Sequence, residues 1–219
     1  VGSEMCIRDR SPEILALANP GAVFVYAGKQ QGHQERIQAE IYQWILHFAE
    51  SALTIVRLKS GDPMVFGRGG EELEFIARHG FAVEVVPGLS SSLAAPALAG
   101  IPVTYRNVAA SFAVVAGHRQ SLTALDWSIY RGIDTLIILM GVENRDLIAR
   151  ALIEQGRPAT QPIAFIEHAS TDRERIVEST LAEVARRNVA VEAPAVFVIG
   201  EVVRLRTRMH RQIAEGVLA

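Results

Sequence analysis

The sequence has little cysteine, no long apolar run and no excess of basic residues. Its single cysteine, Cys6, excludes an intrachain disulfide and a cysteine-cluster metal site, and it fits a reducing cytoplasm. The most apolar stretches, such as residues 89–103, are interrupted by Ser, Pro and Gly and do not reach the roughly 20 apolar residues of a membrane span. A formal net charge of -2 gives no basic face for nucleic acid. We therefore expect a cytoplasmic protein with no membrane span, no nucleic-acid partner and no metal ion.

The composition is typical of a globular protein. The chain has 219 residues, of which 49% are hydrophobic and 21% charged, enough for one large domain or two small ones. Residues 1–10 show neither helical nor strand periodicity and lack the long apolar core of a signal peptide. We interpret these ten residues as a tail or an artefact of gene prediction.

From Ala22 onward, apolar β-branched runs alternate with amphipathic ones, which predicts an α/β fold with largely parallel sheets. The predicted strands are residues 23–26, 53–58, 83–86, 112–116, 135–139, 162–166 and 195–199. The predicted helices are residues 34–49, 71–78, 90–99, 145–154 and 181–187. Gly100 and Pro102 end the helix at 90–99. We therefore predict an N-terminal α/β domain at 11–108 and a C-terminal α/β domain at 109–219.

A glycine-rich loop is the most specific feature of the chain. It follows the strand at 53–58 and reads Lys-Ser-Gly-Asp-Pro-Met-Val-Phe-Gly-Arg-Gly-Gly-Glu-Glu over residues 59–72. Gly61 permits close approach of the backbone to a ligand, and Asp62 accepts hydrogen bonds from ribose hydroxyls or an ammonium group. Taken alone, Gly-Asp-Pro is more often only a turn, and Glu71 and Glu72 only favour a helix start.

The complete string resembles the signature of uroporphyrinogen-III C-methyltransferases within the tetrapyrrole methylase family. Relatives that act on other substrates share a Gly-Asp-Pro-like loop without the Phe-Gly-Arg-Gly-x-Glu-Glu continuation. Further segments agree in order, at residues 26–29, 38–41, 85–91, 99–106, 116–118, 139–141 and 195–203. The resemblance implies a two-domain tetrapyrrole methylase fold, each domain a mainly parallel sheet flanked by helices. It also implies that the cleft between the domains binds the methyl donor and that the protein is a homodimer.

The implied reaction is S-adenosylmethionine-dependent C-methylation of uroporphyrinogen III. Two methyl transfers give precorrin-2, for sirohaem or cobalamin biosynthesis, and leave S-adenosylhomocysteine. Because a sulfonium methyl group is already activated, the protein has mainly to align the reactants and to manage proton loss, without a metal. The alternatives are a sibling methyltransferase acting on another corrinoid, and an inactive fragment or non-catalytic tetrapyrrole-binding homologue.

The resemblance also assigns roles to individual residues. The residues implied to contact the donor are Ser60, Gly61, Asp62, Val65, Ser90, Ser91, Met140 and Ala169. Lys29 and Arg68 are implied to be catalytic, through acid-base work or by pairing with substrate carboxylates, and Arg106 and His118 to bind the substrate. Without the resemblance these would be solvent-facing, core or loop residues of no special role.

The residues before Ser11 depart from the family pattern. Family members begin with a short strand, a Gly-x-Gly-Asp-Pro loop, a helix and a second strand ending in Tyr-Asp-Arg, which we expect to be missing here. Counting back from Lys29 places the family's candidate basic aspartate at Ile7, whereas Asp9 is out of register. Loss of a first strand would leave sheet edges unpaired. We therefore expect the N-terminal domain to lack its first strand and loop.

Overall fold

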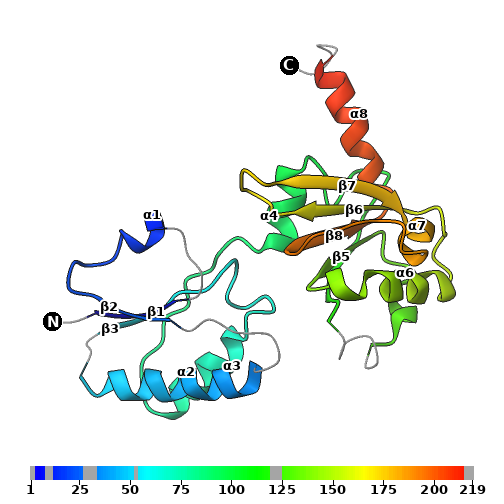
Figure 1. Ribbon diagram of the computed structural model, residues 1–219. Helices are drawn as coiled ribbons and strands as arrows, with labels where there is room; N and C mark the ends of the chain where they lie inside the picture. The colour runs from blue at the N-terminus through cyan, green and yellow to red at the C-terminus, as the bar shows by residue number, and fades with distance from the viewer. Residues whose placement is uncertain (1–2, 8–11, 27–33, 52–53, 119–124, 215–219) are drawn as a thin grey trace. The chain divides into compact units, whose positions relative to one another are not determined.

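The computed structural model describes residues 3–7, 12–26, 34–51, 54–118 and 125–214 (Figure 1). The chain folds as two compact units, residues 1–90 and 91–219. Each unit combines a β-sheet with helices, which confirms the predicted α/β class.

The N-terminal unit contains a three-stranded parallel sheet in the order β2-β1-β3. Its elements are β1 Ser3–Ile7, α1 Pro12–Leu15, β2 Val23–Tyr26, α2 Gln34–Ala49, β3 Thr54–Arg57 and α3 Gly69–Arg78. Figure 1 shows α2 and α3 along one face of this sheet. Ile41 and Ile45 of α2 are buried there, with Val25 of β2 and Ile76 of α3 packed against them. The amphipathic pattern of residues 34–49 thus predicts the helix correctly.

The strand β1 corrects the interpretation of residues 1–10 as a tail. Ser3–Ile7 pairs with β2 on one side and with β3 on the other, so that it is the central strand of the sheet. A short strand that has partners on both sides is held by main-chain hydrogen bonds, which leave no periodicity in the sequence. β1 therefore pairs with the edges of β2 and β3 that were predicted to be unpaired.

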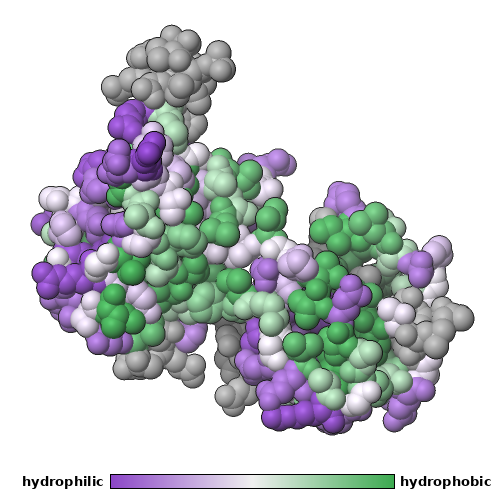
Figure 2. Space-filling model, turned by 180° about the vertical axis from the view of Figure 1, so that it is seen from behind, coloured by the Kyte–Doolittle hydropathy of each residue, from purple (hydrophilic) through white to green (hydrophobic). Residues whose placement is uncertain are grey.

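Residues 81–90 also differ from the prediction, because the expected strand at 83–86 is irregular. The run Val-Glu-Val-Val has strand propensity, but propensity forms a strand only where a neighbouring edge accepts its hydrogen bonds. Val86 is 74% exposed and Leu89 83% exposed. Figure 2 shows exposed hydrophobic residues, coloured green, on the surface of both units.

The C-terminal unit contains a five-stranded mixed sheet in the order β4-β5-β8-β6-β7. The strands are β4 Phe112–Ala116, β5 Thr135–Leu139, β6 Pro162–Glu167, β7 Arg175–Thr180 and β8 Ala195–Ile199. β4 and β5 are parallel, while β8 pairs antiparallel with β5 and β6, and β7 pairs antiparallel with β6. The prediction of a mainly parallel sheet is therefore wrong for this unit. The sequence pattern locates strands but does not fix the direction in which each one enters the sheet.

Helices cover both faces of this sheet. They are α4 Ser91–Leu98, α6 Arg145–Glu154, α7 Leu181–Ala185 and α8 Val203–Ala214, with short 3-10 turns η1 Trp127–Tyr130 and η2 Val142–Asn144. Leu136 and Ile138 of β5 lie in a core cluster with residues of α6 and α7. Ile137 and Leu139 lie in a second cluster with residues of α4 and α8. This alternation is what a strand buried on both faces requires.

The position of α4 moves the boundary between the units. The predicted boundary follows residue 108, whereas the compact units divide after Ser90. Ala95 and Ala99 are buried in the same cluster as residues of β5 and β8, so α4 is part of the C-terminal core. Small residues allow this close packing of helix on sheet. No helix in the described part of the chain is long and apolar enough to cross a membrane.

Candidate functional site

The Gly-Asp-Pro loop, residues 59–68, connects β3 to α3 and is held by its own aspartate. Asp62 Oδ1 accepts a hydrogen bond from the Met64 amide at 2.7 Å, and Oδ2 accepts one from the Gly88 amide at 3.4 Å. Gly61 has φ 66, a left-handed conformation that glycine adopts without strain. Asp62 therefore joins the loop to the segment around Gly88, and its two oxygens keep further acceptor capacity for a ligand.

Three glycines around this loop are required by close contacts. A β-carbon at position 67 would lie 2.6 Å from the carbonyl oxygen of Pro63. At position 69 a β-carbon would lie 2.8 Å from the carbonyl carbon of Pro63, and at position 88 it would overlap the carbonyl group of Gly61. The amide of Gly69 donates to that same Pro63 oxygen at 2.9 Å. The glycines of the motif thus allow the backbone to fold tightly upon itself.

The two glutamates after the loop have different environments, which the sequence interpretation missed. Glu71 is exposed and pairs with Arg68. Glu72 is only 4% exposed, and Lys59 Nζ lies 2.9 Å from its Oε2. Burial alone would raise the pKa of Glu72, but the charge of Arg57 and hydrogen bonds from Lys59 and Gln38 lower it below the ordinary value. The sequence holds no signal that separates these neighbouring residues, apart from their helical phase.

Arg68 is in a left-handed conformation at the start of α3, with φ 61. Its Nε lies 2.9 Å from Glu71 Oε2, and hydrogen bonding to this carboxylate raises the pKa of Arg68. Ser60 and Val65, predicted to contact the donor, lie on the same loop and are exposed. Lys29, the other predicted catalytic residue, lies outside the described residues, as does Asp9.

In the C-terminal unit, three of the predicted residues share one edge of the sheet. β6 runs in the direction of β5, because both are antiparallel to the strand β8 between them, and β4 is parallel to β5. His118, Met140 and Ala169 follow the carboxyl ends of these strands, where ligand-binding loops of α/β sheets collect. Met140 has φ 57 and is 53% exposed, so it is not the ordinary core residue that its position in an apolar run suggests.

Arg106 belongs to the opposite edge of the same sheet. It lies in a turn closed by the bridge between Tyr105 and Ala109, ahead of the amino end of β4. The amide of Ala110, which follows this bridge, donates a hydrogen bond of 2.9 Å to Asp134 at the amino end of β5. The structure therefore does not bring Arg106 together with His118.

The two predicted serines lie at the boundary between the units. Ser90 is the last residue of the N-terminal unit and is 9% exposed, and Ser91 is the exposed first residue of α4.

The family assignment rests on a profile match. The family described as Tetrapyrrole (Corrin/Porphyrin) Methylases matches residues 4–185. The chain belongs to the tetrapyrrole methylase family. The match begins within β1, which agrees with the central place of that strand in the sheet.

Members of the tetrapyrrole methylase family with similar sequences come from several bacteria. The chain is 38% identical over 213 residues to a uroporphyrinogen-III C-methyltransferase of Bacillus subtilis, covering 94% of this chain and 44% of that protein. It is 39% identical over 208 residues to the enzyme of the same name from Priestia megaterium, covering 92% and 87%. The chain thus spans less than half of the Bacillus protein and most of the Priestia protein.

A solved tetrapyrrole methylase structure is similar over nearly the whole chain. It is a uroporphyrin-III C-methyl transferase from Thermus thermophilus complexed with S-adenyl homocysteine. The TM-score is 0.78 and the identity 44%, over 92% of this chain and 87% of that one. This likeness confirms the predicted tetrapyrrole methylase fold of mixed α/β class.

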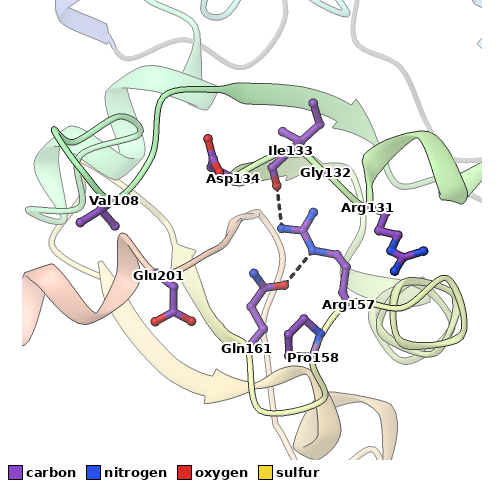
Figure 3. Close-up of a pocket in the computed structure, with 9 residues that line it drawn as sticks. All are labelled: Val108, Arg131, Gly132, Ile133, Asp134, Arg157, Pro158, Gln161 and Glu201. Carbon is purple, nitrogen blue, oxygen red and sulfur yellow. Dashed lines mark hydrogen bonds between the residues drawn. The ribbon is translucent and has the colours of Figure 1, made fainter.

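A polar pocket of about 170 Å³ lies at the amino edge of the C-terminal sheet, and none of the predicted donor residues lines it (Figure 3). Arg157 is one of the residues that line this pocket, and it is 4% exposed. Its guanidinium donates to Gln161 Oε1 at 2.7 Å, to the Tyr130 carbonyl at 2.6 Å and to the Ile133 carbonyl at 3.0 Å. These bonds join the connection between α6 and β6 to the connection between η1 and β5. Among the described residues, no group of His, Cys, Asp or Glu is placed to hold a metal ion.

Arg157→Met is expected to lower the free energy of unfolding by roughly 3 kcal/mol, because it removes the charged hydrogen bonds that Arg157 makes to Gln161, Tyr130 and Ile133. Urea denaturation followed by circular dichroism measures the loss. Arg131→Met is the matched control, since Arg131 lines the same pocket but is exposed, and its loss should stay below about 0.5 kcal/mol. Equal losses in the two variants would contradict this structural role.

Proposed function

We propose that this chain binds S-adenosylmethionine and transfers methyl groups to two carbon atoms of uroporphyrinogen III, giving precorrin-2. The observation that carries the proposal is the Gly-Asp-Pro loop, braced by Asp62 and built on closely packed glycines, in a chain 44% identical to a Thermus enzyme complexed with S-adenyl homocysteine. S-adenosylhomocysteine is the product left after transfer. We further propose that the enzyme works in the cytoplasm as a homodimer.

The residues of the loop fit an adenosyl ligand. A β-carbon at position 88 would overlap the Gly61 carbonyl group, so glycine there lets the segment around Gly88 pack directly against the loop. The carboxylate of Asp62 has acceptor capacity for hydroxyl or ammonium groups. The donor supplies an activated methyl group on a sulfonium, and the chain has to orient the two reactants and exclude misaligned ones. Ser60, Val65, Ser90, Ser91, Met140 and Ala169 are proposed to contribute further donor contacts.

The acceptor is a polycarboxylate, so cationic side chains near the loop are the expected binding groups. Arg68 carries a guanidinium whose partner Glu71 is more than half exposed, at 55% of its side chain. Such an exposed pair exchanges its partner at little cost. Arg68 and Lys29 are therefore proposed to bind substrate carboxylates or assist proton removal from the methylated carbon. His118 is proposed as a further substrate contact, whereas the position of Arg106 at the opposite edge of the C-terminal sheet does not support its predicted role.

The test has two steps on the same preparation. Calorimetric titration with S-adenosylhomocysteine is expected to give a dissociation constant in the micromolar range. Incubation with S-adenosylmethionine and uroporphyrinogen III is then expected to add two methyl groups to the tetrapyrrole, seen by mass spectrometry. Donor binding without methylation would favour a non-catalytic tetrapyrrole-binding homologue. A folded chain that binds no S-adenosylhomocysteine would contradict the proposal.

A further inference from the structure

The ends of the Gly-Asp-Pro loop are tied by one ion pair. Lys59 is the first residue of the loop, and Glu72 lies in the first turn of α3, four residues after Arg68, the last residue of the loop. Lys59 Nζ and Glu72 Oε2 are 2.9 Å apart, and their side chains are only 12% and 5% exposed. A contact between the residues that flank a loop fixes the distance its ends must span.

Glu72 also connects this loop to the other elements of the N-terminal unit. Gln38 of α2 donates to Glu72 Oε1 at 3.1 Å, and Arg57 of β3 lies 3.4 Å from the same oxygen. One carboxylate on α3 therefore receives side chains from α2, from β3 and from the start of the loop. Its position determines where all three meet.

Stability alone does not account for this cluster. A buried ion pair rarely stabilises a fold more than apolar side chains of the same volume would, since its charges lose their hydration. Burial lowers the pKa of Lys59, in spite of its bond to Glu72. In the described part of the chain, Gln38 Oε1 and Arg57 Nε are buried without a hydrogen-bond partner, which adds to the cost. Such an arrangement is explained if the cluster fixes the geometry of the loop.

The loop itself is stiff enough to transmit that geometry. Asp62 is bonded to the amide of Met64, and the Gly69 amide donates to the Pro63 carbonyl at 2.9 Å. A shift at either end therefore moves the segment around Gly61 and Asp62 as one piece. We propose that Glu72 is a positioning residue for the methyl donor. Through its contacts with Lys59 and Arg57 it fixes the position of the loop that binds the donor, without touching the donor itself. The inference rests on the proposed function.

The test compares the affinities of variants of the 219-residue chain for S-adenosylhomocysteine by calorimetry. Glu72→Gln keeps the shape of the side chain but removes its charge, and Lys59→Met keeps length without charge. Each is expected to raise the dissociation constant about tenfold, because small misplacements of binding groups have large effects. The double variant should bind no more weakly than the weaker single variant, since both changes break the same contact. Lys59→Arg, which retains the charge, should keep most of the affinity.

A control separates positioning from general loss of stability. Ile45 of α2 is buried in the same unit but lies in the apolar cluster, so Ile45→Ala should lower the thermal midpoint while leaving the affinity within about twofold of wild type. An equal loss of affinity in Ile45→Ala would overturn the inference, as would unchanged affinity in Glu72→Gln and Lys59→Met. If Glu72→Gln does not fold, the two Lys59 variants decide. A wild-type chain that binds no S-adenosylhomocysteine would instead remove the proposed function.

Discussion

Replacing Gly69 by alanine is expected to weaken the binding of S-adenosylhomocysteine by about 10- to 100-fold, the equivalent of roughly 1–3 kcal/mol. The added methyl group would overlap the carbonyl group of Pro63, which accepts the hydrogen bond of the Gly69 amide at 2.9 Å. Neither partner is a flexible side chain, so the backbone of the loop has to move. Pro63 follows Asp62 directly, and any movement therefore displaces the carboxylate that braces the loop.

The neighbouring glycine supplies the matched control. A β-carbon at Gly70 would meet only the terminal methyl carbon of Met64, at 4.0 Å, an ordinary van der Waals contact. Because Gly70 lies inside α3, Gly70→Ala should leave donor affinity unchanged and stabilise the helix by up to about 1 kcal/mol. Calorimetry and thermal unfolding of the two variants measure both effects. Similar affinities in Gly69→Ala and Gly70→Ala would show that the tight loop is not needed for donor binding.

Elements with strong periodicity were predictable from the sequence. The helix at 34–49 and the strands at 112–116, 135–139 and 195–199 have the predicted bounds. The family resemblance, carried mainly by the string from Lys59 to Glu72, is confirmed by the profile match. Alternation and amphipathicity act within one segment, so a single sequence is enough to reveal them.

Features that depend on distant partners were not predictable. β1 is a strand because β2 and β3 lie on either side of it, and β8 lies between β5 and β6, antiparallel to both. Sequence reasoning also could not separate Glu71 from Glu72, because only the packing against α2 and β3 buries the second carboxylate. The left-handed backbone of Met140 was likewise not predicted, and its neighbour Gly141 packs closely against Phe197 and Ile148.

Arg68 offers the clearest separation of substrate binding from donor binding. Its guanidinium pairs with Glu71, whose side chain is 55% exposed, and exposed pairs of this kind contribute about 0–1 kcal/mol. A substrate carboxylate can therefore displace Glu71 and accept the same two-pronged hydrogen bonds. The donor brace made by Asp62 with the amides of Met64 and Gly88 does not involve the Arg68 side chain. Removing the guanidinium should thus affect the acceptor alone.

Arg68→Gln is accordingly expected to lower kcat/KM for uroporphyrinogen III by about 100-fold, while the affinity for S-adenosylhomocysteine stays within about twofold of wild type. Glutamine and arginine have similar backbone strain in the left-handed conformation at position 68, so the substitution tests the loss of the charge. Arg78→Gln is the control, because Arg78 forms a similar exposed pair with Glu74 in the last turn of α3, and it should alter neither quantity. Glu71→Gln, which releases Arg68, should preserve turnover. If Arg68→Gln weakens the binding of S-adenosylhomocysteine as much as it slows methylation, Arg68 serves the donor, and the substrate carboxylates must be bound by other residues.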